Sequence, residues 1–295
     1  MAKGWITGDE TAKQMLARVL KERPLLLLPH PLHRVPLTVN NIIEIIGPSP
    51  SAKTEILLQV AVTCILPKTW NGIHYGGLQH SVLFIDLDCR LDIFRLSQIL
   101  NLRISETNRN PNHQQDHNHM ELFTDCMKRF SYTKCYDSFQ FLSTLKGLHS
   151  KLEKEKEHRN GGVHVVLIDG IGAFYWIDRG FSSLPQGNHN RKKFCFQTVF
   201  ETVVRELKRL LMVYPVVVLA TKTVTSQVKD WSKNEYREYM PMMWQSFVTH
   251  RILVRASDDK RKIDDRVCYV AEWLLPALNL SDKFFVGDAG ILTLL

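Results

Sequence analysis

Short apolar runs alternate with helical patterns along the middle of the chain. Isoleucines at 42, 43, 45 and 46 precede Gly47, and the apolar residues after Lys53 recur at intervals of three and four. The first pattern predicts a buried strand and the second an amphipathic helix. The succession continues with strands predicted at 82–85, 163–168 and 216–219, and with helices at 91–99, 139–157 and 192–212. It predicts an α/β fold whose mostly parallel sheet is covered by helices on both faces.

Beyond about residue 245, strand patterns follow one another without helices between them. The runs 247–254, 266–273 and 284–286 are separated by charged turns, a pattern typical of successive antiparallel strands. We therefore expect the sheet to become antiparallel at its C-terminal end. The predicted core covers residues 41–295, and residues 1–40 form a helical or extended N-terminal segment.

The N-terminal segment contains one amphipathic pattern. A helix over 11–21, capped by Asp9 or Thr11, would carry four apolar residues on one face. These residues are Met15, Leu16, Val19 and Leu20. The face could pack on the chain's own core or lie in a partner's groove, and of the two we favour packing on the core.

Composition excludes some classes of protein. The 295 residues are 44% hydrophobic and 23% charged, which is ordinary for a globular chain, and the formal net charge is +8. A basic balance suits a polyanion partner, nucleic acid first, although mildly basic soluble proteins are common. No apolar run approaches the length of a membrane span, and the N-terminus lacks the apolar stretch of a signal peptide. The six scattered cysteines suggest reduced thiols in the cytosol or nucleus.

One segment, 108–119, is rich in Asn, Gln and His. Its histidines at 113, 117 and 119 could bind a metal ion. No cysteine accompanies them and the residues between them are polar, so we favour a solvated loop.

A phosphate-binding loop is the strongest motif. Residues 47–54 match the pattern G-x-x-x-x-G-K-[ST] except at its second glycine, and they lie between a predicted strand and a predicted helix. The loop consists of Gly47, Pro48, Ser49, Pro50, Ser51, Ala52, Lys53 and Thr54. Its backbone N–H groups would hold the phosphates of ATP, Lys53 would reach the terminal phosphates, and Thr54 would bind Mg²⁺. The alternative is a plain strand–turn–helix with a chance Lys-Thr pair.

Two residues weaken this loop. Ala52 adds a methyl group where the pattern has glycine, and Pro50 has no N–H to donate. Each could cost about 1–3 kcal/mol of binding energy, the cost of one lost polar contact. We expect weak ATP binding at most.

Carboxylates end two of the predicted strands. Asp169 follows an apolar run and is placed to orient Mg²⁺. Asp86 and Asp88 end the preceding strand, and Asp88 is the candidate catalytic acid; its alternative role is that of a helix N-cap.

At these residues the chain resembles the RecA-type recombinases, and among them the eukaryotic recombinase paralogues. The resemblance extends from about residue 42 to 291. It rests on Cys64–Lys68, Val82–Asp86, Trp244-Gln245, His250-Arg251, Gly287–Gly290 and above all Ala173–Arg179. It implies a RecA-like ATPase core in which Lys53 and Thr54 contact phosphate and metal and Asp169 is the second-strand acid. Asp88 stands where active recombinases place Glu, and Thr223 where they place a phosphate-sensing Gln, so both departures make sustained ATP hydrolysis doubtful.

The resemblance also implies a cellular role. It predicts a nuclear protein of homologous recombination repair and meiosis. Only 46 residues precede Gly47, too few for the N-terminal domain through which full recombinases polymerise. The resemblance therefore implies a heterodimer with another recombinase paralogue within a larger complex. Single-stranded or branched DNA would be the ligand and no membrane would be involved.

Two segments are candidates for DNA contact. The first is polar, follows Trp176, and corresponds by resemblance to a recombinase DNA-binding loop. Its basic residues are Arg179, Arg191, Lys192 and Lys193. The second, 224–243, interleaves basic and aromatic residues in a pattern typical of base stacking. For each segment the alternative is an ordinary surface loop.

Three functions remain open on the sequence alone. The chain could be a weakly nucleotide-binding subunit of a recombination-mediator complex, which we favour. It could be an autonomous DNA-stimulated ATPase, which the altered phosphate loop disfavours. It could also be a small-molecule kinase with decayed motifs, which the basic loops and the aromatic segment at 174–176 disfavour.

Overall fold

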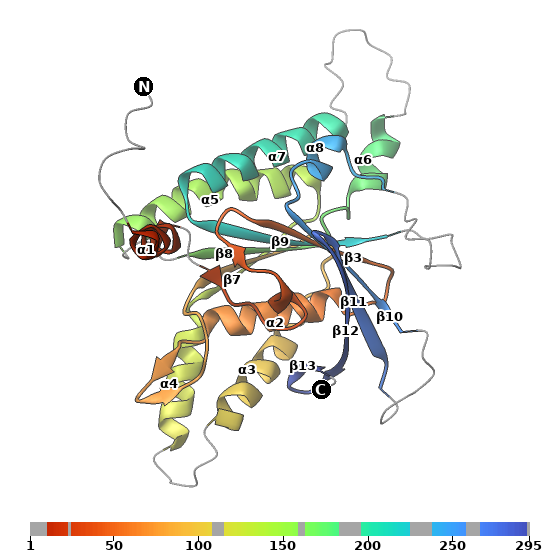
Figure 1. Cartoon of the computed structure of the whole chain (residues 1–295). Coiled ribbons are helices and arrows are strands. Elements are labelled where there is room, and N and C mark those ends of the chain that lie inside the picture. Colours follow the sequence, from red (N-terminus) through yellow and green to blue (C-terminus); the bar gives the residue numbers. More distant parts are fainter. Residues whose placement is uncertain are drawn as a thin grey trace.

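A twisted sheet crosses the centre of the molecule (Figure 1). The computed structural model describes residues 11–22, 25–107, 115–158, 163–182, 196–224, 238–257 and 266–293. Within these residues, nine strands form one sheet in the order β13-β12-β11-β10-β3-β9-β8-β6-β7. In chain order they are β3 (Ile42–Gly47), β6 (Ser81–Asp86), β7 (Phe130–Lys134), β8 (His164–Asp169), β9 (Val216–Thr223), β10 (His250–Ala256), β11 (Cys268–Leu275), β12 (Ala277–Gly287) and β13 (Gly290–Thr293). Two small pairs lie apart, β1 (Leu25–Leu26) with β2 (Leu37–Thr38) and β4 (Thr69–Trp70) with β5 (Ile73–His74).

Strand direction changes once across the sheet. From β10 to β7 all neighbouring strands are parallel, whereas β10 to β13 pair antiparallel. Both parts of this arrangement were predicted and are confirmed. The parallel register places Gly47 opposite Thr223 and Asp86 opposite Asp169. The carboxyl ends of the central strands therefore meet at one edge, where open α/β sheets bind their ligands.

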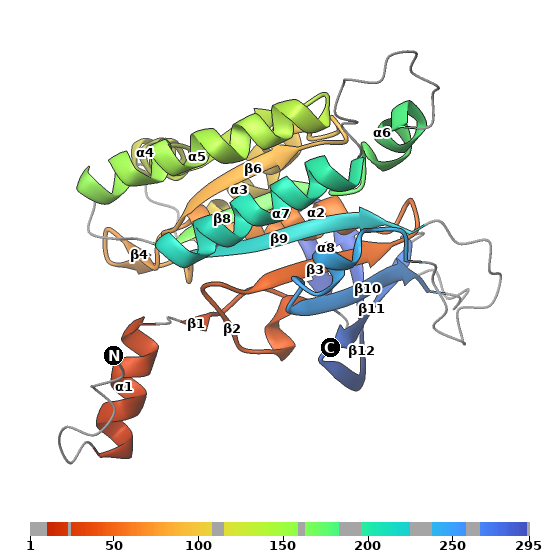
Figure 2. The ribbon, with the colours of Figure 1, turned by 90° about the horizontal axis from the view of Figure 1, so that it is seen from above.

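Helices cover both faces of the sheet (Figures 1 and 2). They are α2 (Lys53–Ile65), α3 (Ile93–Thr107) and α4 (Gln115–Met127) on one side, and α5 (Ser138–His158), α6 (Tyr175–Ser182), α7 (Phe196–Val213) and α8 (Met242–Gln245) on the other. Strand residues alternate between the two cores, since Ile43 and Ile45 pack with α2 whereas Ile42 packs with the α5–α7 layer. Among the described residues, no helix is long and apolar enough to span a bilayer.

The N-terminal helix α1 (Ala12–Glu22) extends away from the sheet and its covering helices (Figure 2). Its N-cap is Thr11, whose hydroxyl accepts the N–H of Gln14 while its own N–H donates to the Gln14 side chain, a capping box. Met15 and Leu16 are 54% and 59% exposed. The prediction that this face packs on the chain's own core is therefore wrong for these two residues.

Several boundaries differ from those predicted. The C-terminal strands extend further along the chain than the apolar runs indicated, and β12 covers eleven residues in place of the predicted three. Strand β7 was not predicted at all, because its sequence Phe-Ser-Tyr-Thr-Lys at the sheet edge carries no continuous apolar run. The beginning of the polar segment after Trp176 is helical, since α6 continues to Ser182.

The His-rich segment is also partly helical. Residues 108–114, with His113, lie outside the described residues, but 115–119 form the first turns of α4, so the loop prediction is wrong there. Nε2 of the half-buried His119 lies 3.4 Å from the Ser105 hydroxyl. The side chain of His117 is not among those described.

Candidate nucleotide and DNA site

The loop between β3 and α2 keeps the backbone of a phosphate loop despite its altered sequence. Gly47 has no room for a side chain, because a Cβ there would lie 2.0 Å from the carbonyl oxygen of Val254 on β10. Ala52, in place of the second glycine, has φ 58° and ψ 17°. That left-handed conformation costs a non-glycine residue about 1–2 kcal/mol. The tight turn is therefore retained although the residue that favours it is absent.

Lys53 is bound by its own loop. Its ammonium group donates to the carbonyl oxygens of Gly47 (3.0 Å) and Pro48 (2.7 Å) and to the Ser51 hydroxyl (2.9 Å). Burial lowers the pKa of Lys53 to about 8, while the charges of Asp169 and Asp88 act in the opposite direction. A phosphate group that bound Lys53 would have to replace these three partners.

The metal-binding pair predicted from the sequence is in contact. The Thr54 hydroxyl donates to Oδ2 of Asp169 at 2.8 Å, and the Thr221 hydroxyl donates to its Oδ1 at 2.5 Å. Burial raises the pKa of Asp169, and these two hydrogen bonds oppose the rise. A hydroxyl and a carboxylate side by side suit Mg²⁺, which prefers oxygen ligands. The residues present therefore fit the ion at Thr54 and Asp169.

Asp88 lies beside this pair. A Cβ on Gly170 would come within 2.5 Å of the Asp88 carboxyl carbon, so Gly170 leaves the space that Asp88 occupies. Burial raises the pKa of Asp88, and Asp86 adds to the rise whereas Arg90 and Lys53 oppose it. The alternative role of helix N-cap falls to Asp92, which accepts the N–H of Phe94 at the start of α3, while Asp86 accepts the N–H of Leu91 (2.9 Å) before the helix.

Of the four predicted DNA-binding cations, only Arg179 is among the described residues. Its guanidinium donates to the Tyr175 hydroxyl at 2.7 Å and lies over the Tyr175 ring. Arg191, Lys192 and Lys193 lie outside the described residues. The structure therefore places one of the four near the aromatic residues of α6.

An aromatic cluster joins the two predicted DNA-facing segments. Tyr239, within the second segment, lies 4.8 Å from Tyr175 and 6.1 Å from Trp176 between ring centroids. The Tyr239 hydroxyl donates to the carbonyl oxygen of Thr223 at 3.0 Å. Trp176 stays more than half exposed, so the cluster leaves one aromatic side chain accessible to solvent.

Beneath this cluster lies a buried network of charges that was not predicted. Glu44, fully buried in β3, contacts Lys222 Nζ (3.0 Å) and Arg251 Nε (2.6 Å) and accepts the indole N–H of Trp244 (2.7 Å). Lys222 also contacts Glu238 at 2.6 Å. Lys222 lies before residues 225–237 and Glu238 lies directly after them. The ion pair therefore holds the chain on the two sides of this segment together.

The chain can now be compared with known proteins. Residues 34–293 match the family described as Rad51. The chain belongs to the Rad51 family. It is 46% identical to the DNA repair protein XRCC2 homolog of Arabidopsis thaliana, over 99% of this chain and 90% of that protein. It is 29% identical to mouse DNA repair protein XRCC2, over 85% of this chain and 84% of that protein. The bovine DNA repair protein RAD51 homolog 4 is 24% identical over 85% of this chain and 64% of its own length. The predicted resemblance and RecA-like fold are confirmed.

The buried network provides a stability prediction. Removing one member of a buried ion pair leaves its partner charged without compensation, which lowers stability by about 3–5 kcal/mol. Lys222→Met should lower the free energy of unfolding by this amount in urea denaturation, because Glu44 and Glu238 both lose a cation. The exposed Lys146→Met is the matched control, expected within about 0.5 kcal/mol of wild type. Equal stability of the two variants would show that Lys222 does not hold the network together.

Proposed function

We propose that this Rad51-family DNA repair protein is a non-polymerising subunit of a recombinase-paralogue complex. In this proposal it acts in the nucleus as a mediator of homologous recombination, repairing double-strand breaks and serving meiotic recombination. It binds single-stranded or branched DNA together with its partners and binds ATP weakly at most. The names of its relatives support the repair role, and the geometry of the phosphate loop supports the restriction on ATP.

The observation that carries the proposal is the position of the Lys53 ammonium. Two loop carbonyls and one hydroxyl already satisfy its three N–H donors. A terminal phosphate must therefore displace existing hydrogen bonds, and its energetic gain is reduced by their loss. Pro50 supplies no N–H in the middle of the same loop. Both effects weaken nucleotide binding without altering the fold.

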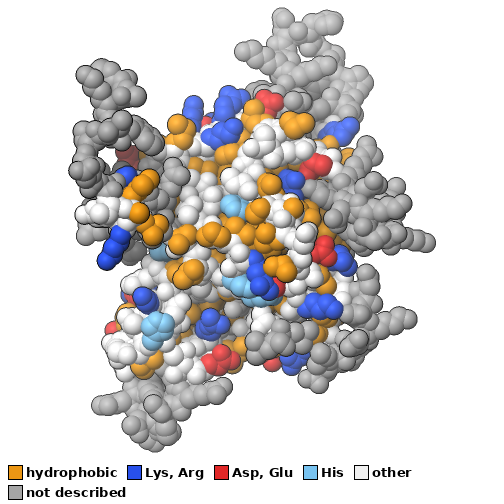
Figure 3. All heavy atoms as spheres, in the orientation of Figure 1, with side chains coloured by type: hydrophobic (Ala, Val, Ile, Leu, Met, Phe, Trp, Pro, Cys, Tyr) orange, Lys and Arg blue, Asp and Glu red, His pale blue; other side chains and the backbone are white. Residues whose placement is uncertain are grey.

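The proposal for DNA rests on the region around the aromatic cluster. Tyr175 and Trp176 lie at the start of the first candidate segment and Tyr239 lies in the second, and Arg179 adds a cation over the Tyr175 ring. Exposed aromatic rings stack on unpaired bases, whereas cations bind backbone phosphates. On the face seen in Figure 3, basic side chains are more frequent than acidic ones, which agrees with the net charge of +8.

The proposal for a partner rests on the N-terminal segment. Met15 and Leu16 on α1 and Leu25 and Leu27 beside it are all exposed. Contiguous exposed apolar side chains at a soluble surface commonly mark an interface. A second recombinase paralogue covering this region would give a heterodimer.

An autonomous DNA-stimulated ATPase is the second candidate. It is favoured by the contact between Thr54 and Asp169, which preserves the metal-binding pair of an active site. The small-molecule kinase considered from the sequence is not supported by membership of the Rad51 family.

The two candidates differ in how much they depend on Lys53. We expect Lys53→Ala to restore double-strand-break survival in cells lacking this protein about as well as wild type, because little depends on ATP turnover. Lys53→Arg, which keeps the charge, is the matched control and should behave alike. Steady ATP hydrolysis by the purified protein that disappears in Lys53→Ala, together with lost survival, would favour the ATPase instead.

The interface predicts an oligomeric state. Light scattering of the chain co-expressed with recombinase paralogues should give a one-to-one heterodimer with one of them. The double variant Met15→Glu/Leu16→Glu should not form it, because burying two carboxylates in an apolar interface is unfavourable. Met212→Glu, at a still more exposed methionine on α7, should still form it. A heterodimer insensitive to the double variant would place the interface elsewhere, and self-assembly into filaments on DNA would contradict the subunit proposal.

A further inference from the structure

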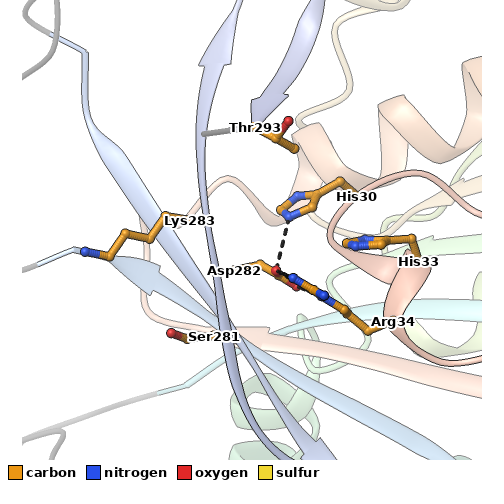
Figure 4. Close-up of a pocket in the computed structure, with 7 residues that line it drawn as sticks. All are labelled: His30, His33, Arg34, Ser281, Asp282, Lys283 and Thr293. Atoms are coloured by element: carbon orange, nitrogen blue, oxygen red, sulfur yellow. Dashed lines mark hydrogen bonds and ion pairs between the residues drawn. The ribbon is translucent and has the colours of Figure 1, made fainter. Parts of the chain in front are cut away.

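A second polar cluster lies where the N-terminal segment meets the C-terminal hairpin of β12 and β13. The 3₁₀ turn η1 (Leu32–Arg34) brings His33 and Arg34 to β12, and His30 precedes it. Facing them is Asp282 on β12, with Thr293 of β13 nearby (Figure 4). Together with Ser281 and Lys283 these residues line a cavity of about 600 Å³.

Three side chains of the cluster have the spacing of metal ligands. Ligand atoms of His30, His33 and Asp282 all lie within 4.8 Å of one another. The two histidines are three residues apart in a tight turn, which brings their rings together at a centroid distance of 4.8 Å. The Nε2 atom of His30 lies 3.5 Å from Oδ1 of Asp282. The ligands thus come from two segments about 250 residues apart.

Protein groups alone leave His30 incompletely satisfied. Its Nδ1 is buried and has no hydrogen-bond partner among the described residues. In a neutral imidazole one of the two ring nitrogens keeps an available lone pair. A neutral imidazole is the form that binds metal ions.

Asp282 is held as a buried carboxylate. Arg34 donates to it through Nε, 3.1 Å from both oxygens, and also through Nη2. Carboxylates that bind metals are commonly oriented by such an outer partner.

We propose that His30, His33 and Asp282 form a Zn²⁺ site that fastens the N-terminal segment to the hairpin of β12 and β13. Two imidazoles and one carboxylate are a zinc ligand set that leaves a fourth position for water. The cavity in front of the cluster provides room for that water. The site lies outside the candidate nucleotide and DNA site and does not depend on the proposed function.

Arg34 provides the strongest argument against a cation here. Its charge repels Zn²⁺, and without a metal the cluster is simply a buried carboxylate paired with Arg34 and His30. However, the Arg34 side chain is 41% exposed, so solvent screens much of its charge. Arg34 and His30 both approach Oδ1 of Asp282, so the guanidinium holds the carboxylate in place beside the imidazole (Figure 4). We therefore assign Arg34 the role of orienting Asp282.

The test is a titration of the full-length chain with Zn²⁺, followed by calorimetry and by thermal unfolding. Wild type should bind one Zn²⁺ at this site and unfold at a higher temperature with the metal. His33→Gln removes an exposed ligand, and Asp282→Asn keeps the shape of the buried one. Each should weaken binding by at least about tenfold, the smallest loss typical of a disturbed metal site. His74→Gln, at an exposed histidine outside the cluster, is the matched control and should bind as wild type.

Substitution with Co²⁺ identifies the ligands independently. A site of two histidines and one carboxylate should give visible d–d absorption without the near-ultraviolet band of a cobalt–thiolate bond. That band would instead place the metal on cysteines and overturn the assignment. Wild-type Zn²⁺ affinity in His33→Gln would also overturn it. So would the loss of Zn²⁺ binding in the double variant His113→Gln/His117→Gln. Unfolding of each variant without metal shows that it is folded before its affinity is compared.

Discussion

The carboxylate of Asp169 joins the parts of the molecule on which the candidate site depends. It ends β8, accepts a hydrogen bond from Thr54 at the start of α2, and accepts another from Thr221 on β9. Because β8 and β9 are neighbours in a parallel sheet, their carboxyl ends can share one acidic side chain. The same Thr221 hydroxyl accepts the N–H of Gly170, which fixes the turn that follows the strand. The phosphate loop, the acid and the strand that leads to residues 225–237 are thus held in one hydrogen-bonded group.

From this group, contacts continue to the candidate DNA-facing segments on the other face of β9. Thr221 points toward Asp169, whereas the next residue, Lys222, points into the buried ion network, as alternation along a strand requires. Glu238 and Tyr239 return to this same strand end. The end of β9 therefore contacts both the candidate nucleotide site, through Thr221, and the candidate DNA-facing residues, through Lys222. These two residues are adjacent in the chain, so the two candidate sites are joined by one peptide bond.

Local sequence patterns predicted the central architecture because the parallel strands are buried on both faces. Such strands read as continuous apolar runs, and the runs ending at Gly47, Asp86 and Asp169 gave β3, β6 and β8 closely. Edge strand β7 has one exposed side and carries no such run. The composition of the His-rich segment predicts a loop, because composition alone does not show a helix that packs on α3.

The parts of the site that could not be predicted depend on contacts between distant residues. The motif placed Lys53 near phosphate, but only the folded loop shows its ammonium on the carbonyls of Gly47 and Pro48. Glu44 carries a signal in the sequence itself. A carboxylate in the middle of an apolar strand has to be paired with a cation when both faces are covered. Its cations, Lys222 and Arg251, are about 180 and 210 residues away, and no local pattern connects them.

The most direct measurement is the titration of the Lys53 amine by NMR in the full-length chain, with and without Mg–ATP. Burial should hold its pKa at about 8, below the ordinary 10.5. Since burial disfavours the charged form, the folded state should gain stability as pH rises from about 8 to 10.5, and Lys53→Met should remove that gain. We expect physiological Mg–ATP to leave the pKa nearly unchanged, because the loop itself satisfies the ammonium. A pKa near 10.5 in the free protein, or a clear upward shift on adding Mg–ATP, would show that Lys53 is available to phosphate and contradict the weak-binding proposal.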